Sequence, residues 1–298
     1  MNKQIKIIIA IGIIGILIMV AGYVMGSGPS SIPTIFSESN VPAGAASLKD
    51  VSTEEIHSIE LNLFASKISI KSGENFDMSG SGEFDCYVEN GTLHAGATEN
   101  KRSTKILGIS VPSKWICGYG SYVLVIPPNA KLDQITINTN RSNLTCDSLI
   151  ASKININVKH GNLITDTLSA DNASINVGGR FTASKTKIER TGTITSKQNL
   201  YIGTSGSSKE SVLNNTTLSN KRGGITLYGK LTGNGSLQSD AGNIETVLSG
   251  TASNYTIPSN EHLTVHSSAI DSSDAKNQKQ FGTVSINASK GNASVSFE

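Results

Sequence analysis

The sequence predicts an all-β protein: a parallel β-solenoid (β-helix) of about 19-residue coils, preceded by one N-terminal transmembrane helix. Three observations lead to this prediction. Residues in the central part of the chain alternate between apolar and polar with period two, which is typical of strands. A long uncharged apolar run lies near the N-terminus, from Ile7 to Met25. An Ile-Asn pair recurs at a constant interval of about 19 residues, at Ile137-Asn138, Ile156-Asn157 and Ile175-Asn176.

The apolar run predicts a membrane anchor over residues 1–26. As a helix rising 1.5 Å per residue, the run would span about 28 Å, close to the thickness of a bilayer core. Lys3 and Lys6 precede the run and the next basic residue is Lys49, so the positive-inside rule places the N-terminus in the cytoplasm and the C-terminal domain outside the cell. The alternative is a cleaved signal peptide, although the small residues of Ala43-Gly44-Ala45 lie far beyond the apolar run.

Residues 27–56 contain Pro29, Pro33 and Pro42 among serines and glycines, a composition that predicts a flexible stalk. The repeat domain then occupies residues 57–298. A 19-residue unit is too short for a strand with a crossover helix, which needs roughly 30 residues. It suits a coil of short strands joined by turns, in which each unit buries its apolar face by stacking on its neighbours.

The repeat continues in both directions from the central Ile-Asn pairs. Apolar residues follow each Ile after six or seven positions, the register is interrupted by a predicted loop over residues 204–210, and division of the domain by the period gives on the order of 12 coils. The C-terminus ends on a strand with no evident cap, and an exposed edge of this kind favours end-to-end self-association. The positions in phase are Leu61, Ile68, Leu144, Leu163, Phe181, Ile194, Leu218, Ile225, Leu237, Ile244 and Ile286.

Alternation predicts that Ile137, Ile156 and Ile175 face the core and that Asn138, Asn157 and Asn176 face outward. Amides stacked at strand spacing can hydrogen-bond along the stack. This outward ladder has two interpretations: it stabilises the stack itself, or it is a flat polar surface that binds a cell-wall polymer or an envelope protein.

Asp147 and Asp166 are separated by the same period and are expected on neighbouring coils, with Lys185 next in the same column. Two carboxylates could form an acid/base pair or part of a calcium site. The alternative is a solvated column with no chemical role. Calcium needs six or more oxygen ligands, and no others occur in phase. The sequence therefore predicts no catalytic residues, no metal and no cofactor.

Cysteine usage and charge limit the remaining possibilities. Cys146 shares the face of Leu144 and is expected in the core. Cys86 and Cys117 could form a disulfide in an extracellular setting, the alternative being two free buried thiols. The net charge of +2 and the pI near 8.3 are too small to indicate a nucleic-acid partner.

The run from Tyr122 to Leu132 leads directly into Ile135–Asn140, and Gly282–Ile286 leads toward Gly291–Phe297. These motifs resemble the "putative adhesin" β-strand-repeat family of unknown function, whose LiaG-like members are membrane-anchored proteins of the bacterial cell envelope. The chain departs from the family pattern at Arg141-Ser142, where glycine is usual. The resemblance implies a parallel β-solenoid on a membrane anchor, and it transfers no catalytic residue.

The sequence thus predicts a single-pass cell-membrane protein with an extracellular domain. Its expected role is structural or interactive at the cell envelope, either adhesin-like or associated with envelope stress, and non-catalytic. The alternative is an enzyme that processes envelope polysaccharides on a β-helix scaffold.

Overall fold

The computed structural model describes residues 56–80, 84–97, 103–106, 109–112, 120–205, 210–259, 262–266 and 280–298. All of them lie in the second of two compact units of the chain, Ala43–Glu298. The predicted anchor at 1–26 and nearly all of the predicted stalk at 27–56 lie outside these residues. No helix within the described ranges is long and apolar enough to cross a membrane.

The described residues form an all-β structure with one short 3-10 turn, Ala252–Asn254. The strands are β1 (Ser58–Leu63), β2 (Ala65–Ser72), β3 (Asp77–Gly80), β4 (Asp85–Glu89), β5 (Thr92–Ala97), β6 (Ser103–Ile106), β7 (Ile109–Pro112), β8 (Gly120–Ile126), β9 (Gln134–Arg141), β10 (Asn143–His160), β11 (Leu163–Val177), β12 (Phe181–Ser196), β13 (Leu200–Ile202), β14 (Val212–Asn214), β15 (Thr216–Asn220), β16 (Ile225–Ser239), β17 (Ile244–Leu248), β18 (Tyr255–Thr256), β19 (Leu263–His266), β20 (Gly282–Ala288) and β21 (Ala293–Phe297).

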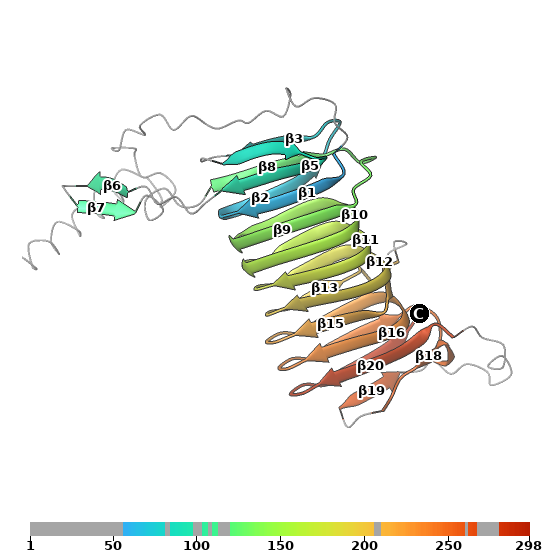
Figure 1. The fold of residues 1–298 in the computed structure, drawn as a ribbon. Helices are drawn as coiled ribbons and strands as arrows, with labels where there is room; N and C mark the ends of the chain where they lie inside the picture. The colour runs from blue at the N-terminus through green and yellow to red at the C-terminus, as the bar shows by residue number, and fades with distance from the viewer. Residues whose placement is uncertain are drawn as a thin grey trace, which may run out of the picture. The chain divides into compact units, whose positions relative to one another are not determined.

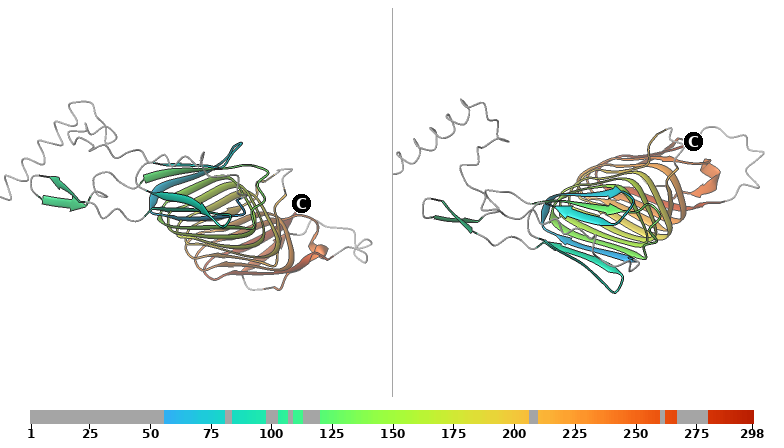
Figure 2. Two further views of the ribbon diagram at one scale, coloured as in Figure 1. Left: turned by 45° about the horizontal axis from the view of Figure 1, so that its top comes forward. Right: turned by 90° about the horizontal axis from the view of Figure 1, so that it is seen from above.

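Apart from the β6–β7 hairpin, the strands join into one closed sheet. Most pairings are parallel. Those that join β9 to β10, β10 to β11 and β11 to β12 link segments about one period apart along the chain, so these four strands stack in chain order (Figure 1). Strands β3 and β4 are the exceptions, since they pair antiparallel with β8 and β5. Figure 2 shows from two further directions how successive turns of the chain overlie one another.

The repeat register is confirmed at its central positions. Ile156 pairs with Ile137 on one side and Ile175 on the other, and all three are at most 2% exposed. The offset is longer between Ile194 and Leu218, across the predicted loop at 204–210. It returns to the repeat period between Leu218 and Leu237.

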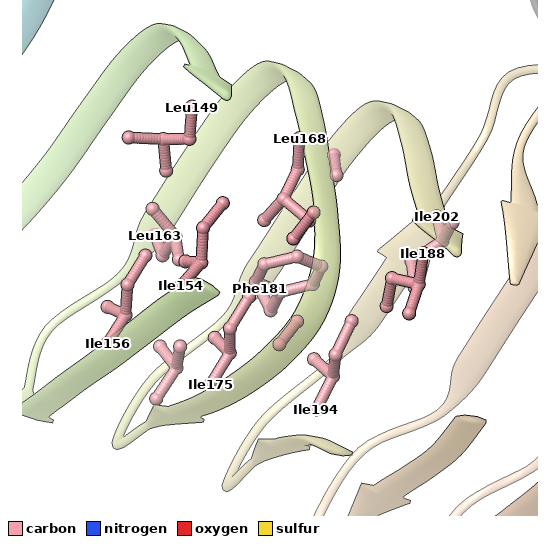
Figure 3. Packing of buried hydrophobic residues seen from close by; sticks show 14 of the residues in the cluster. Leu149, Ile154, Ile156, Leu163, Leu168, Ile175, Phe181, Ile188, Ile194 and Ile202 are labelled. Atoms are coloured by element: carbon pink, nitrogen blue, oxygen red, sulfur yellow. The ribbon is translucent and has the colours of Figure 1, made fainter. Parts of the chain in front are cut away.

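The core is a stack of aliphatic side chains at three places in each turn. Leu149 and Leu168 form one of these stacks, Ile156, Ile175 and Ile194 form another, and Leu163 packs in a third, where Phe181 follows it (Figure 3). Strands β9 to β12 alternate between buried and outward residues, and the inward residues of neighbouring turns lie in register. The apolar faces of the turns are therefore buried against one another, as the period-two pattern predicts.

Two expectations about the length and end of the stack are wrong. Within the described residues the Ile137 column has nine positions rather than about 12, because some of its pairings join segments more than one period apart, as between Leu61 and Ile137 and between Leu237 and Ile286. The C-terminal strand β21 is not a sheet edge, because it pairs with β17 on one side and β19 on the other. The nine positions are Ala95, Leu61, Ile137, Ile156, Ile175, Ile194, Leu218, Leu237 and Ile286.

Candidate functional site

The predicted outward ladder exists, and it begins one turn earlier than expected. Asn62 on β1 is in register with Asn138 on β9, which is in register with Asn157 and then Asn176. The three predicted members are exposed, as is Asn62. We call these four the face asparagines.

The face asparagines hydrogen-bond to one another. Asn138 Nδ2 donates to Asn62 Oδ1 at 3.0 Å, and Asn176 Nδ2 donates to Asn157 Oδ1 at 3.1 Å. Each bond uses part of the donor and acceptor capacity of its amides, because a primary amide offers two N–H donors and two acceptor lone pairs. Capacity therefore remains on this surface for a ligand.

A second asparagine ladder, at the corners of the turns, was not predicted as a ladder. Each member directly precedes a residue of the Leu144 column, and we call them the corner asparagines: Asn143, Asn162, Asn199 and Asn243. Asn162 Oδ1 accepts the backbone N–H of Arg180 at 2.8 Å, and Asn243 Oδ1 accepts that of Asn292 at 3.0 Å. These side chains satisfy backbone donors of the adjacent turn, which is a structural role.

Asp147 and Asp166 lie on adjacent strands and both are exposed. The pairs Cys146–Thr165 and Ser148–Thr167 place the two carboxylates side by side in register. Asp147 Oδ2 accepts the backbone N–H of Ser72 at 3.1 Å, so one carboxylate already has a structural partner. Within the part of the chain that the structure describes, no group of three His, Cys, Asp or Glu residues could hold a metal ion.

The expected position of Lys185 is wrong. Lys185 pairs with Thr167 rather than following Asp166, because the offset between β11 and β12 is one residue shorter than the period over this segment. The missing residue is recovered at a register shift between Ala170 and Asn172. Lys185 therefore does not continue the column of the two carboxylates.

The two described cysteines differ in burial. Cys146 is 3% exposed, as predicted, and burial, with the nearby Asp147 charge, raises the pKa of its thiol. Cys86 is half-buried, and burial raises the pKa of its thiol to about 11, with a smaller contribution from Asp77. A thiol with a raised pKa is a poor nucleophile near neutral pH. Cys117 lies outside the described residues, so its pairing with Cys86 stays a prediction.

An aromatic pair that lies beside the face asparagines was not predicted from the sequence. Tyr87 on β4 stacks on His94 of β5, with ring centroids 5.0 Å apart and ring planes at 22°. The two strands form a hairpin through Asn90 and Gly91, both at positive φ. An Asn-Gly pair between alternating segments is a strong hairpin signal, and a two-residue turn there places Tyr87 opposite His94. The sequence therefore contained the signal for this contact.

Comparisons with known proteins give no family assignment. No family model matches the chain, and no curated protein matches it. Among solved structures, a putative adhesin from Bacteroides fragilis matches with a TM-score of 0.36 at 11% identity, over 82% of this chain and 93% of the other. A putative cell adhesion protein from Clostridium sporogenes matches with a TM-score of 0.22 at 11% identity, with the same coverage. Likenesses at this level assign neither a fold nor a function.

Proposed function

We propose that this chain is a parallel β-solenoid, held at the bacterial cell membrane by the predicted anchor, that binds an envelope component on its outward face. The proposal includes an extracellular domain and a non-catalytic role of the adhesin-like or stress-associated kind. The observation that carries it is the row of face asparagines. It lies at fixed registers on a continuous parallel sheet and retains unused hydrogen-bonding capacity.

Two features of the site support binding over catalysis. The pair with the best spacing for acid/base chemistry, Asp147 and Asp166, is exposed, and Asp147 accepts a backbone hydrogen bond. The face asparagines carry no net charge, and an uncharged amide row suits recognition by hydrogen bonds.

The test is capture of envelope material by the full chain, purified in detergent with a C-terminal tag. We expect wild type to retain a component from intact bacterial envelopes. A variant with Asn138→Ala and Asn157→Ala should retain at least several-fold less. The matched control is Thr145→Ala with Thr182→Ala, two outward residues on a different run of strands.

The outcomes separate the alternatives. Equal capture by both variants would show that the face asparagines only stabilise the stack. Loss of envelope glycan turnover on Asp147→Asn or Asp166→Asn would instead support the polysaccharide-processing enzyme. Absence of any capture by wild type would overturn the proposed function.

A further inference from the structure

The outward face has a distinct composition where β4, β5 and β1 lie side by side. Tyr87 is 51% exposed, the largest exposed fraction among the large apolar and aromatic side chains that the structure describes. The ring of His94 stacks on it and so restricts the orientations that the exposed ring can take before a ligand binds. Preorganised exposed aromatics are typical of binding surfaces, because little conformational entropy is lost when a ligand docks on them.

A chain of polar contacts links this aromatic pair to the face asparagines. His94 Nδ1 lies 3.3 Å from Glu60 Oε2, and Glu60 Oε1 accepts a hydrogen bond from Asn62 Nδ2 at 2.7 Å. Asn62 Oδ1 in turn accepts from Asn138. The carboxylate and the amide are thus fixed next to an aromatic face, each with lone pairs or N–H groups still available.

The row of residues that runs across β4, β5 and β1 through Asn62 leaves space beside the aromatic pair and Glu60. Gly96 stands between Asp85 and Asn62 in that row, and a Cβ placed on it would meet only the backbone oxygen of Asn62, at 4.0 Å. The absence of a side chain at this position allows a ligand to approach Asn62 and His94 from the side of Asp85.

Aromatic, carboxylate and amide groups in this combination match a pyranose sugar. The C–H face of the ring packs on an aromatic side chain, while neighbouring hydroxyls donate to a carboxylate and pair with an amide. The charge of the surrounding strands narrows the class of sugar further. Strands β1, β4 and β5 carry the acidic residues Glu60, Asp85 and Glu89 and have no lysine or arginine. An anionic polymer would be repelled here, because like charges in proximity are destabilising.

We propose that Tyr87, His94, Glu60 and Asn62 form a binding site for an uncharged glycan, built of hexose or N-acetylhexosamine units. The glycan extends from this site along the face asparagines toward Asn138. This proposal specifies the class of ligand that binds along the face asparagines, and so it rests on the proposed function.

The test uses the full chain in detergent and calorimetric titration with three tetrasaccharides: cellotetraose, chitotetraose and tetragalacturonic acid. We expect binding of at least one of the two uncharged probes and much weaker binding of the anionic one. Tyr87→Ala and Glu60→Gln should each lower the affinity for the uncharged probe by about 10-fold or more, as expected when one stacking or charged contact is lost. The matched control is Tyr201→Ala, a partly exposed outward tyrosine on β13, which should leave the affinity unchanged.

Three results would overturn the site. One is the absence of binding by both uncharged probes, another is preference for tetragalacturonic acid, and the third is an equal loss in Tyr87→Ala and Tyr201→Ala. Envelope capture by the same protein distinguishes this failure from that of the proposed function. If the Tyr87→Ala variant captures envelope material as well as wild type does, the chain has the proposed function but not this site. Capture that persists after glycosidase digestion of the envelope would identify a protein partner and would also overturn the site.

Discussion

Gly161 shows how closely successive turns approach each other at a corner. It lies between β10 and β11 with φ at +131°, a region that residues with a Cβ rarely adopt. A Cβ at this position would also overlap the backbone carbonyl of Ser142, one turn earlier. Glycine is therefore required here both by the backbone conformation and by the neighbouring turn.

We expect Gly161→Ala to lower the free energy of unfolding by about 2 kcal/mol or more, since it combines positive-φ strain with a backbone clash. The matched variant is Gly96→Ala, whose added methyl has no neighbour closer than 4.0 Å and which should change stability by less than about 0.5 kcal/mol. Urea denaturation monitored by circular dichroism measures both. Equal losses in the two variants would contradict the requirement at Gly161.

Residue by residue, burial was the most predictable property. Ile137, Ile156 and Ile175 are buried as expected, because alternation along a strand reports directly which face each side chain occupies. Hydrogen-bond partners were less predictable. The acceptor of the Arg180 N–H is Asn162, which lies one turn earlier in the chain, and such a partner is known only once the register between turns is known.

At the scale of elements, the two asparagine ladders differ in what they bond. A corner asparagine satisfies a backbone N–H, whereas a face asparagine bonds another exposed side chain. Loss of an acceptor for a backbone donor costs more than loss of an exposed amide–amide contact, because water replaces the latter readily. The corner asparagines therefore stabilise the stack. This was one of the two roles that the sequence suggested for the face asparagines.

We expect Asn162→Ala to destabilise the protein by about 1–2 kcal/mol, since the Arg180 N–H loses its acceptor and the Asn143 side chain loses a donor. Asn176→Ala, which removes one exposed bond to Asn157, should cost less than about 0.5 kcal/mol. Thermal melts of the two variants give the comparison. A larger loss for Asn176→Ala would mean that the face ladder stabilises the stack, and would weaken its assignment to ligand binding.

Elements also show where a strict period misleads. Extrapolation by one full period placed Lys185 beside Asp166, but the chain between Ile175 and the start of β12 is one residue shorter than the corresponding segment of the turn before it, and the register shift between β11 and β12 restores the period. A local irregularity of this kind depends on how two strands pack, which a periodic pattern does not encode. The Tyr87–His94 hairpin was predictable in principle from Asn90-Gly91, since that signal is local.

At the scale of the whole molecule, the sequence predicted the type of stacking better than its extent. Period and alternation predict parallel pairing of successive turns, because both are properties of each turn. The number of turns and the capping of the C-terminal strand depend on segments outside the repeat. Strand β19 covers β21 although Leu263–His266 lies well before β21 in the chain, and no feature of its sequence indicates that position.

A stack of interchangeable turns should tolerate the loss of one complete turn. Deletion of residues 153–171 joins Ser152 to Asn172, which takes the place of Lys153, its partner in register. Ile175 then replaces Ile156 in the core column, and Phe181 replaces Leu163 next to Leu144. We expect this variant to fold with a cooperative thermal transition and a modestly lower Tm, because each turn contacts mainly its two neighbours.

The decisive control is a shorter deletion that shifts the following residues out of register with the neighbouring turns. Removal of residues 163–171 takes away fewer residues, yet it puts Asn172 in the place of Leu163, against the buried Leu144. An amide at that position is buried without the partners it has on the surface, at a cost of several kcal/mol, and the following residues lose their register with both neighbours. We expect this variant to lose its cooperative transition. If it melted at the same temperature as the full-turn deletion, the turns would not be equivalent units and the proposed β-solenoid would be wrong.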